Sequence, residues 1–164
     1  MQSPDMPIEP LPPTGISKIL GLCEVLDDHG GKENIYRLSQ DLHMALAELL
    51  LVLKAAHTLG LIRTPDDDAV LTELGKHAIT DSLSEKKALL RQQMLKLSLF
   101  QAVVSLLERK DGELPADVLV EQLALLLPQE QPREVFTTIL NWGRYGEIFG
   151  YSRETDHFYL QKRP

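Results

Sequence analysis

The side chains that could carry chemistry in this sequence are five histidines, one cysteine and several carboxylates. A metal site on a helix favours two histidines in the spacing His-x3-His, and no pair of histidines here has that spacing. We therefore expect each histidine to be a surface or partly buried side chain, and we predict no metal site. The five are His29, His43, His57, His77 and His157.

The single cysteine, Cys23, is expected to be a small buried side chain on the apolar face of a helix. One cysteine cannot form a disulfide within the chain, and it excludes a zinc site built from cysteines of one chain. No histidine neighbours it in the sequence, so nucleophilic catalysis is not indicated. This cysteine usage favours a reducing compartment.

The segment Gly30-Gly31-Lys32 invites comparison with a phosphate-binding loop. A P-loop requires Gly-x4-Gly-Lys-Ser/Thr between a strand and a helix. Here a helix precedes the glycines, the spacing differs, and Glu33 stands where a hydroxyl is needed. We interpret the paired glycines as a helix stop. We predict no bound ATP, no cofactor and no enzymatic activity.

Two runs of aspartate, 27–28 and 66–68, could in principle hold a divalent cation. Neither run supplies the spaced oxygen ligands of a calcium loop. We interpret the first run as part of a helix end and the second as a solvated turn.

Apolar spacing predicts the elements that position these side chains in the first half of the chain. A helix from Ile16 to the 27–31 stop is followed by helices over 35–42 and 45–59. The helix over 45–59 is apolar nearly all round, so we expect it to be largely buried. A hairpin of 61–63 and 69–71 and a short helix over 73–79 come next. Three helices followed by a hairpin is the winged-helix order.

The second half repeats this order in outline. The pattern predicts one long helix over 84–109, helices over 115–127 and 133–145, and a hairpin of 147–151 and 157–160. We therefore predict a mainly α fold with small β-hairpins, in which two tandem winged-helix-like units are joined by a long helix. The predicted domains are a proline-rich linker or tail over 1–14, a first unit over 15–82, and the long helix with the second unit over 83–164.

The N-terminal 14 residues contain half of the ten prolines, which predicts an extended segment. A disordered start and a tether to something upstream both fit this composition. The first residues lack a basic and apolar leader, and the longest apolar run, Leu49 to Leu53, is far shorter than the roughly 20 residues of a membrane span. We expect a cytoplasmic protein without direct membrane insertion.

The net charge of −7 is unevenly distributed. Residues 1–82 hold 13 acidic and 6 basic side chains, whereas residues 83–164 hold 11 of each. An acidic hairpin tip at 66–68 and a helix over 45–59 without base-reading side chains make the first half a poor reader of DNA. Nucleic acid is therefore not an expected partner.

Six of the nine aromatic residues lie between Trp142 and Tyr159, where we expect a small core between a helix and a hairpin. Aromatic residues and arginines are also enriched at the centres of protein interfaces. We therefore name Arg144, Tyr151 and Arg153 as candidate partner contacts.

Four stretches of the chain carry a family resemblance. They are GLCEVLDDHGG at 21–31, IYRL at 35–38, LTELG at 71–75 and NWGRYGEIFGY at 141–151. The chain resembles the AAA-associated C-terminal domain of ATP-binding subunits of nitrate/sulfonate/bicarbonate (taurine-type) ABC importers. The resemblance extends from Pro12 to about Leu160.

The resemblance implies a bacterial or archaeal cytoplasmic module whose partner is an ABC transporter ATPase subunit, in cis or in trans. Peripheral association with the inner membrane would follow from that partner. Walker A, signature and Walker B segments are missing, so we expect either an excised domain or a free-standing member. No catalytic residues can be carried over from the family.

We therefore predict a non-catalytic regulatory or protein-interaction module of an ABC importer ATPase. The alternative is a winged-helix DNA-binding transcriptional regulator, which the fold and the C-terminal arginines would support. The long apolar helix also raises the expectation of a homo-oligomer.

Overall fold

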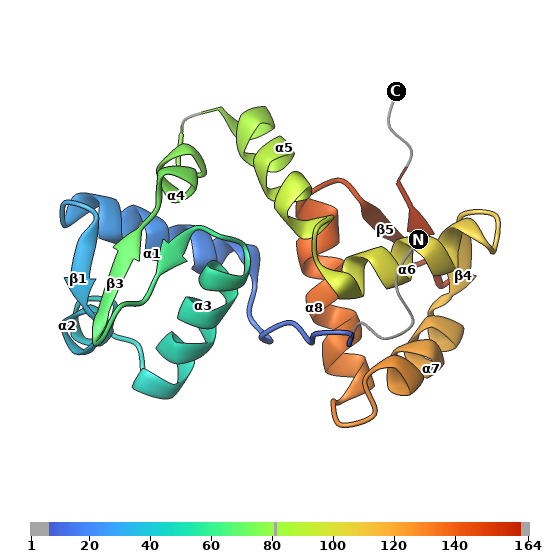
Figure 1. The fold of residues 1–164 in the computed structure, drawn as a ribbon. Helices are drawn as coiled ribbons and strands as arrows, with labels where there is room; N and C mark the ends of the chain where they lie inside the picture. The colour runs from blue at the N-terminus through green and yellow to red at the C-terminus, as the bar shows by residue number, and fades with distance from the viewer. Residues whose placement is uncertain (1–6, 81, 162–164) are drawn as a thin grey trace. The chain divides into compact units, whose positions relative to one another are not determined.

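The computed structural model describes residues 7–80 and 82–161 and shows a mainly helical chain with two small antiparallel sheets (Figure 1). Residues 1–6 of the predicted tail lie outside the described part. The chain forms two compact units. We call Thr14–Leu90 the N-terminal unit, and 7–13 together with 91–161 the C-terminal unit. Among the described residues, no helix combines the length and the apolar character that crossing a membrane would require.

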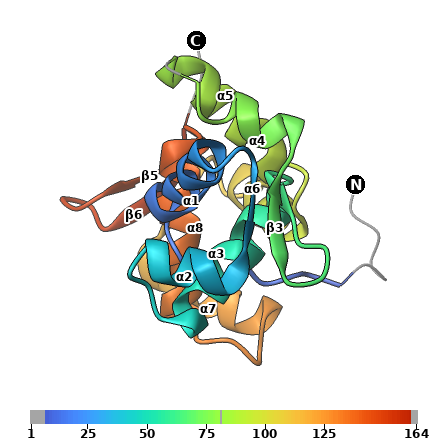
Figure 2. The same cartoon turned by 90° about the vertical axis from the view of Figure 1, so that its left-hand side faces the viewer.

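The N-terminal unit follows the order helix, strand, two helices, two strands and a short helix (Figures 1 and 2). In this unit α1 contacts α3 and β3, and α3 contacts β2. Its elements are α1 (Ile16–Asp28), β1 (Lys32–Asn34), α2 (Ile35–Asp41), α3 (Leu46–Thr58), β2 (Ile62–Arg63), β3 (Asp68–Leu71) and α4 (Glu73–His77). The next helix, α5 (Leu83–Met94), contains the boundary between the units.

The C-terminal unit repeats the order helix, strand, two helices and two strands. Its elements are α6 (Ser98–Glu108), β4 (Glu113–Pro115), α7 (Ala116–Leu126), α8 (Pro132–Tyr145), β5 (Phe149–Ser152) and β6 (His157–Leu160). The helices predicted over 115–127 and 133–145 are confirmed as α7 and α8, with ends shifted by one residue.

Each sheet has three strands, of which the sequence patterns predicted two. The predicted hairpins are confirmed as the antiparallel pairs β2–β3 and β5–β6. A third strand, β1 or β4, pairs with the last strand of its unit and gives the orders β1-β3-β2 and β4-β6-β5. Each added strand is three residues long, too short to show the alternation by which strands are recognised.

The predicted likeness of the two halves extends to individual backbone hydrogen bonds. The amide of Gly31 donates to the carbonyl of Leu26 at the end of α1, over 2.7 Å. The amide of Gly112 donates in the same way to Leu107 at the end of α6, over 2.8 Å. Both glycines have positive φ, 91° and 90°, which an L side chain rarely adopts.

The same two glycines also connect the first and last strands of their sheets. The carbonyl of Gly31 accepts the amide of Leu71, and the carbonyl of Gly112 accepts the amide of Leu160, each over 2.8 Å. A third matching pair links α3 to Leu61 and α8 to Ile148, through the carbonyls of Ala56 and Gly143 respectively. The two units therefore share one backbone plan.

The single long helix predicted over 84–109 is wrong, because the chain forms two helices there. Between α5 and α6, Leu97 adopts an extended conformation with φ −83° and ψ 136°. Leu90 and Met94 are buried on α5, and Leu99, Phe100, Val103 and Leu107 on α6. In one straight helix, at about 100° per residue, these two sets would point roughly 140° apart, so one set would face solvent. The break allows both sets to be buried.

The predicted aromatic core of the second half is confirmed. Trp142, Phe149 and Phe158 are fully buried, and the rings of Phe149 and Phe158 lie 4.9 Å apart. Phe100 of α6 completes the core, with its ring parallel to that of Phe149 at 5.5 Å. Tyr159, in contrast, is exposed on β6.

The described part of the proline-rich segment, 7–13, forms neither helix nor strand but is packed rather than free. Its Leu11 is only 8% exposed, and the amide of Glu9 donates to Ser98 Oγ over 2.9 Å. These residues belong to the C-terminal unit, although the chain continues from them into the N-terminal unit.

Two helical glycines differ in the space beside them and provide a test of the packing. A Cβ at Gly143 in α8 would overlap the ring of Phe149, whereas one at Gly21 in α1 would meet no atom within 4 Å. We expect Gly143→Ala to lower the free energy of unfolding by about 1–3 kcal/mol, because Phe149 is fixed in the aromatic core. Gly21→Ala should raise it by up to about 1 kcal/mol, through helix propensity. Chemical denaturation measures both, and equal effects of the two variants would contradict the described packing.

Cys23 lies fully buried in α1, as predicted, and this burial raises the pKa of its thiol to about 12. The folded protein should therefore react with a thiol reagent at pH 8 at least about a hundredfold more slowly than the protein in denaturant. A colour-forming disulfide reagent measures both rates. Fast labelling under native conditions would show that α1 is not packed as described.

Candidate functional site

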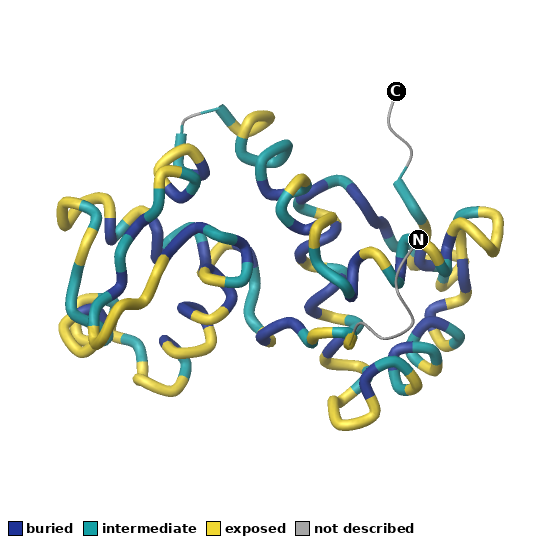
Figure 3. The backbone as a smooth tube through the Cα atoms, viewed as in Figure 1, coloured by how far each residue is buried: buried dark blue, intermediate teal, exposed yellow. Residues whose placement is uncertain are grey.

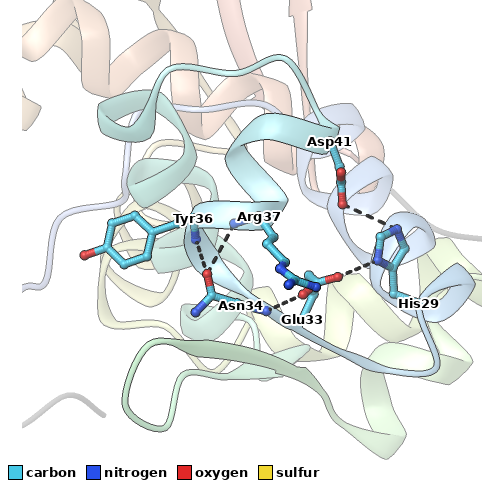
Figure 4. A network of polar contacts seen from close by, with 6 residues as sticks. All are labelled: His29, Glu33, Asn34, Tyr36, Arg37 and Asp41. Atoms are coloured by element: carbon cyan, nitrogen blue, oxygen red, sulfur yellow. Dashed lines mark hydrogen bonds and ion pairs between the residues drawn. The ribbon is translucent and has the colours of Figure 1, made fainter.

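A surface of the N-terminal unit formed by α2 and α3 combines exposed apolar side chains with a cleft. The preceding strand β1 sets where α2 begins. Asn34 caps α2, because its Oδ1 accepts the amides of Tyr36 over 3.0 Å and Arg37 over 3.3 Å (Figure 4). The amide of Ile35, the first residue of α2, donates to the carbonyl of Asp67 over 2.8 Å. The acidic turn thus also has a structural role.

A polar network holds β1 and α2 near the end of α1 (Figure 4). The ring of His29 approaches Glu33 Oε2 through Nδ1, at 2.8 Å, and Asp41 Oδ2 through Nε2, at 3.7 Å. The amide of Asn34 donates to Glu33 Oε1 over 2.8 Å. The hydrogen bond with His29, followed by the one from Asn34, holds the pKa of the Glu33 carboxyl below its ordinary value.

The same cluster contains three residue types that bind metal ions. One ligand atom each from His29, Glu33 and Asp41 can be chosen within 4.8 Å of one another. However, each ring nitrogen of His29 already faces one of the carboxylates. In this arrangement no ring nitrogen is left to bind a metal together with both carboxylates. We therefore assign the cluster to the support of α2.

The expectation that the helix over 45–59 is largely buried is wrong for one of its faces (Figure 3). Leu49, Val52 and Ala56 are fully buried, whereas Leu46 is 39% and Leu50 is 50% exposed. The apolar composition all round the helix therefore reflects two faces with different roles. One face packs into the core, and the other is presented to solvent.

The exposed face of α3 borders a cleft of about 290 Å³. Apolar side chains of α2 and α3 meet one cation and one carboxylate there, and none of the lining residues is an arginine or an amide. The cleft is lined by Ile35, Leu50, Leu53, Lys54, His57, Thr64 and Asp66. Tyr36, 57% exposed, points away from the His29 network (Figure 4). We call Tyr36, Leu46 and the cleft together the α2–α3 surface.

The equivalent face of the C-terminal unit has a different chemistry. Aligning Ala56 with Gly143, whose carbonyls accept matching hydrogen bonds, superimposes the α3 sequence on that of α8. Positions 46, 50, 54 and 57 then correspond to 133, 137, 141 and 144, and all eight are exposed. In order, the residues are Leu, Leu, Lys and His on α3, and Arg, Thr, Asn and Arg on α8. At these four corresponding positions, exposed leucines therefore occur on α3 and not on α8.

The predicted contacts Arg144, Tyr151 and Arg153 all lie in the C-terminal unit but not in one cluster. Tyr151, on β5, packs its ring edge against Phe136 and donates its hydroxyl to Asp156. That hydrogen bond raises the pKa of Tyr151. Arg153 lies in the turn that follows, and Arg144 lies in the last turn of α8. Along α8, Arg144 is about 12 Å from Phe136, so the structure brings Tyr151 and Arg153 to one hairpin and leaves Arg144 apart.

The sequence patterns missed the α2–α3 surface because exposed and buried leucines look alike in a helix that is apolar all round. One signal could have found it: Lys54 and His57 share a face with Leu46 and Leu50 at helical spacing. The carboxylate of Asp41 could not have been placed near His29, because its position depends on where α2 begins.

The family model for the C-terminal AAA-associated domain matches residues 36–152, from α2 to the end of β5. Comparisons with curated proteins and with solved structures gave no match. The matched region contains two of the four stretches on which the resemblance rests, LTELG and NWGRYGEIFGY, and most of a third, IYRL. The family is described as an associated domain rather than a catalytic one, and its description suggests a place beside an ATPase. The chain belongs to the C-terminal AAA-associated domain family.

Proposed function

We propose that the chain is a non-catalytic regulatory module that binds the ATPase subunit of an ABC importer of the nitrate/sulfonate/bicarbonate type. The module would act in cis or in trans, by contacts that bias opening of the ATPase dimer or assembly of the transporter. Its location would then be cytoplasmic, and peripheral to the inner membrane through the transporter.

The observation that carries the proposal is the α2–α3 surface. Leu46 and Leu50 are 39% and 50% exposed, beside a cleft of about 290 Å³. Binding of a protein partner over them is favourable because it removes their apolar surface from water. Membership of an ATPase-associated family supplies the class of that partner. The surrounding Lys54, His57 and Asp66 are suited to the polar rim of such an interface.

We further propose that each unit is a variant of the winged helix. The order helix, strand, two helices and two strands, with the first strand paired to the last, supports this in both units. In such a fold α3 stands at the recognition-helix position. Exposed leucines there are poor ligands for base edges or phosphates, and none of the described features favours the DNA-binding alternative.

The hairpin of the C-terminal unit is proposed as a second contact, through Tyr151 and Arg153, and Arg144 in the last turn of α8 is proposed as a separate contact of the same unit. Self-association stays a prediction, although the described chain has the separate helices α5 and α6 in place of the single long apolar helix that suggests it.

The first test replaces an exposed leucine of the α2–α3 surface. We expect Leu50→Asp to weaken binding to the cognate ATPase subunit at least about tenfold, or about 1.4 kcal/mol, because it places a carboxylate in an apolar interface. Titration calorimetry with the purified subunit measures the Kd. Leu125→Asp is the matched control, because Leu125 is 75% exposed on α7 of the other unit.

Two outcomes would overturn the proposal. One is the absence of binding to the cognate ATPase together with an unchanged ATPase rate when the module is added. The other is an equal loss of affinity in both leucine variants, which would remove the α2–α3 surface from the interface.

The second test addresses the hairpin contact. We expect Arg144→Glu with Arg153→Glu to weaken the same binding by a few-fold, about 0.5–1 kcal/mol, because exposed charges at an interface rim contribute little each. Lys110→Glu is the control for a charge reversal at an exposed position of the same unit. A double variant that binds like the control would exclude this second contact.

A further inference from the structure

The C-terminal unit contains a groove along α6 in which part of the wall is supplied by the N-terminal segment. The groove encloses about 300 Å³. Residues of α6 and α7 form most of it, and Ile8 supplies the remaining wall. The residues from the two helices are Ala102, Ser105, Leu106, Arg109, Gln122 and Leu126.

The N-terminal segment follows one face of α6. Ser98, Ala102, Leu106 and Arg109 are spaced by three or four residues and so share a side of that helix. Ser98 Oγ accepts the amide of Glu9, over 2.9 Å, at one end of this row. The segment therefore contacts α6 both through its backbone and through the side chain of Ile8.

Burial varies along the segment and is greatest at Leu11 and Pro12. Pro7, Glu9 and Pro13 are exposed, whereas Leu11 is 8% exposed and Pro12 is buried. The prolines fix φ and remove backbone donors, so the segment loses little entropy on docking and leaves few amides without a partner.

We propose that the groove along α6 is a recognition site for an extended proline-rich segment anchored by an isoleucine side chain, and that residues 7–13 occupy it through Ile8 as a separable ligand of their own chain. The contact is small, and the groove keeps a cavity beside Ile8. Its affinity for a free peptide is therefore weak, and the tether makes the docking effective by raising the local concentration of the segment.

Docking also has a consequence for the N-terminal unit. The chain enters that unit at Thr14, directly after the segment, and leaves it within α5. Docking therefore restrains the chain directly before the point where it enters that unit.

The test measures thiol accessibility in the full chain, where Cys23 is buried and gives a slow background. Leu11→Cys should react with a maleimide about tenfold more slowly than Pro13→Cys, its exposed neighbour two residues away. A peptide of residues 7–14, added at millimolar concentration, should raise the Leu11→Cys rate toward that of Pro13→Cys. The Pro13→Cys rate should not change.

A groove variant gives an independent readout. In the Leu11→Cys background, Leu106→Asp should raise the labelling rate, whereas Leu125→Asp, outside the groove and 75% exposed, should not. Circular dichroism checks the fold of each variant. If Leu106→Asp proves to be unfolded, the peptide experiment alone tests the proposal.

Three results would overturn the proposal. Equal labelling of Leu11→Cys and Pro13→Cys would show that the segment is not docked. A Leu11→Cys rate that excess peptide leaves unchanged would show that the segment is not a separable ligand. Protection that grows with protein concentration would show that a second copy supplies the segment.

Discussion

The turn that ends the first helix of each unit is the constraint on which the rest of the unit depends. Gly31 and Gly112 both have positive φ. The amide of each glycine donates to a carbonyl at the end of the preceding helix, and its carbonyl accepts an amide of the last strand of the sheet. One residue thus fixes the direction of the chain and the register of a sheet. A side chain there would strain the backbone conformation that both bonds require. The later elements of each unit are positioned by these two hydrogen bonds, because they join the first helix to the last strand.

The position of α2 shows how the constraint reaches the surface. Once β1 is paired with β3, Asn34 stands at the start of α2 and caps it, while Glu33 and Asp41 reach His29 from either side. The helix is short, so these contacts rather than helix propensity hold it. One face of the neighbouring helix α3 packs into the core, and its other face borders the cleft that also contacts α2. A structural polar network and an apolar surface therefore lie on the same pair of helices.

Local signals in the sequence predicted most of the elements. The elements that depend on residues far apart in the sequence were missed. Glycines and prolines mark helix ends directly, so α1, α3, α7 and α8 were predicted to within a few residues. The strands β1 and β4 exist only because a distant strand pairs with them. The break at Leu97 depends on which side chains become buried in the folded unit, and a pattern of apolar residues does not contain that information. The docking of Ile8 and Glu9 likewise depends on helices that lie some 90 residues or more away in the sequence.

The two units share one backbone plan and differ in the chemistry of the surfaces that α3 and α8 present. Their backbone hydrogen bonds match, and positions 46, 50, 54 and 57 of α3 and their counterparts on α8 are all exposed. The chemistry differs: Leu46 and Leu50 on α3 correspond to Arg133 and Thr137 on α8. Solubility alone would favour polar side chains at these positions, as α8 has them. Exposed leucines on α3 cost solubility without stabilising its core, which is already filled by Leu49, Val52 and Ala56. A partner bound as in the proposed function would cover Leu46 and Leu50 and remove this cost.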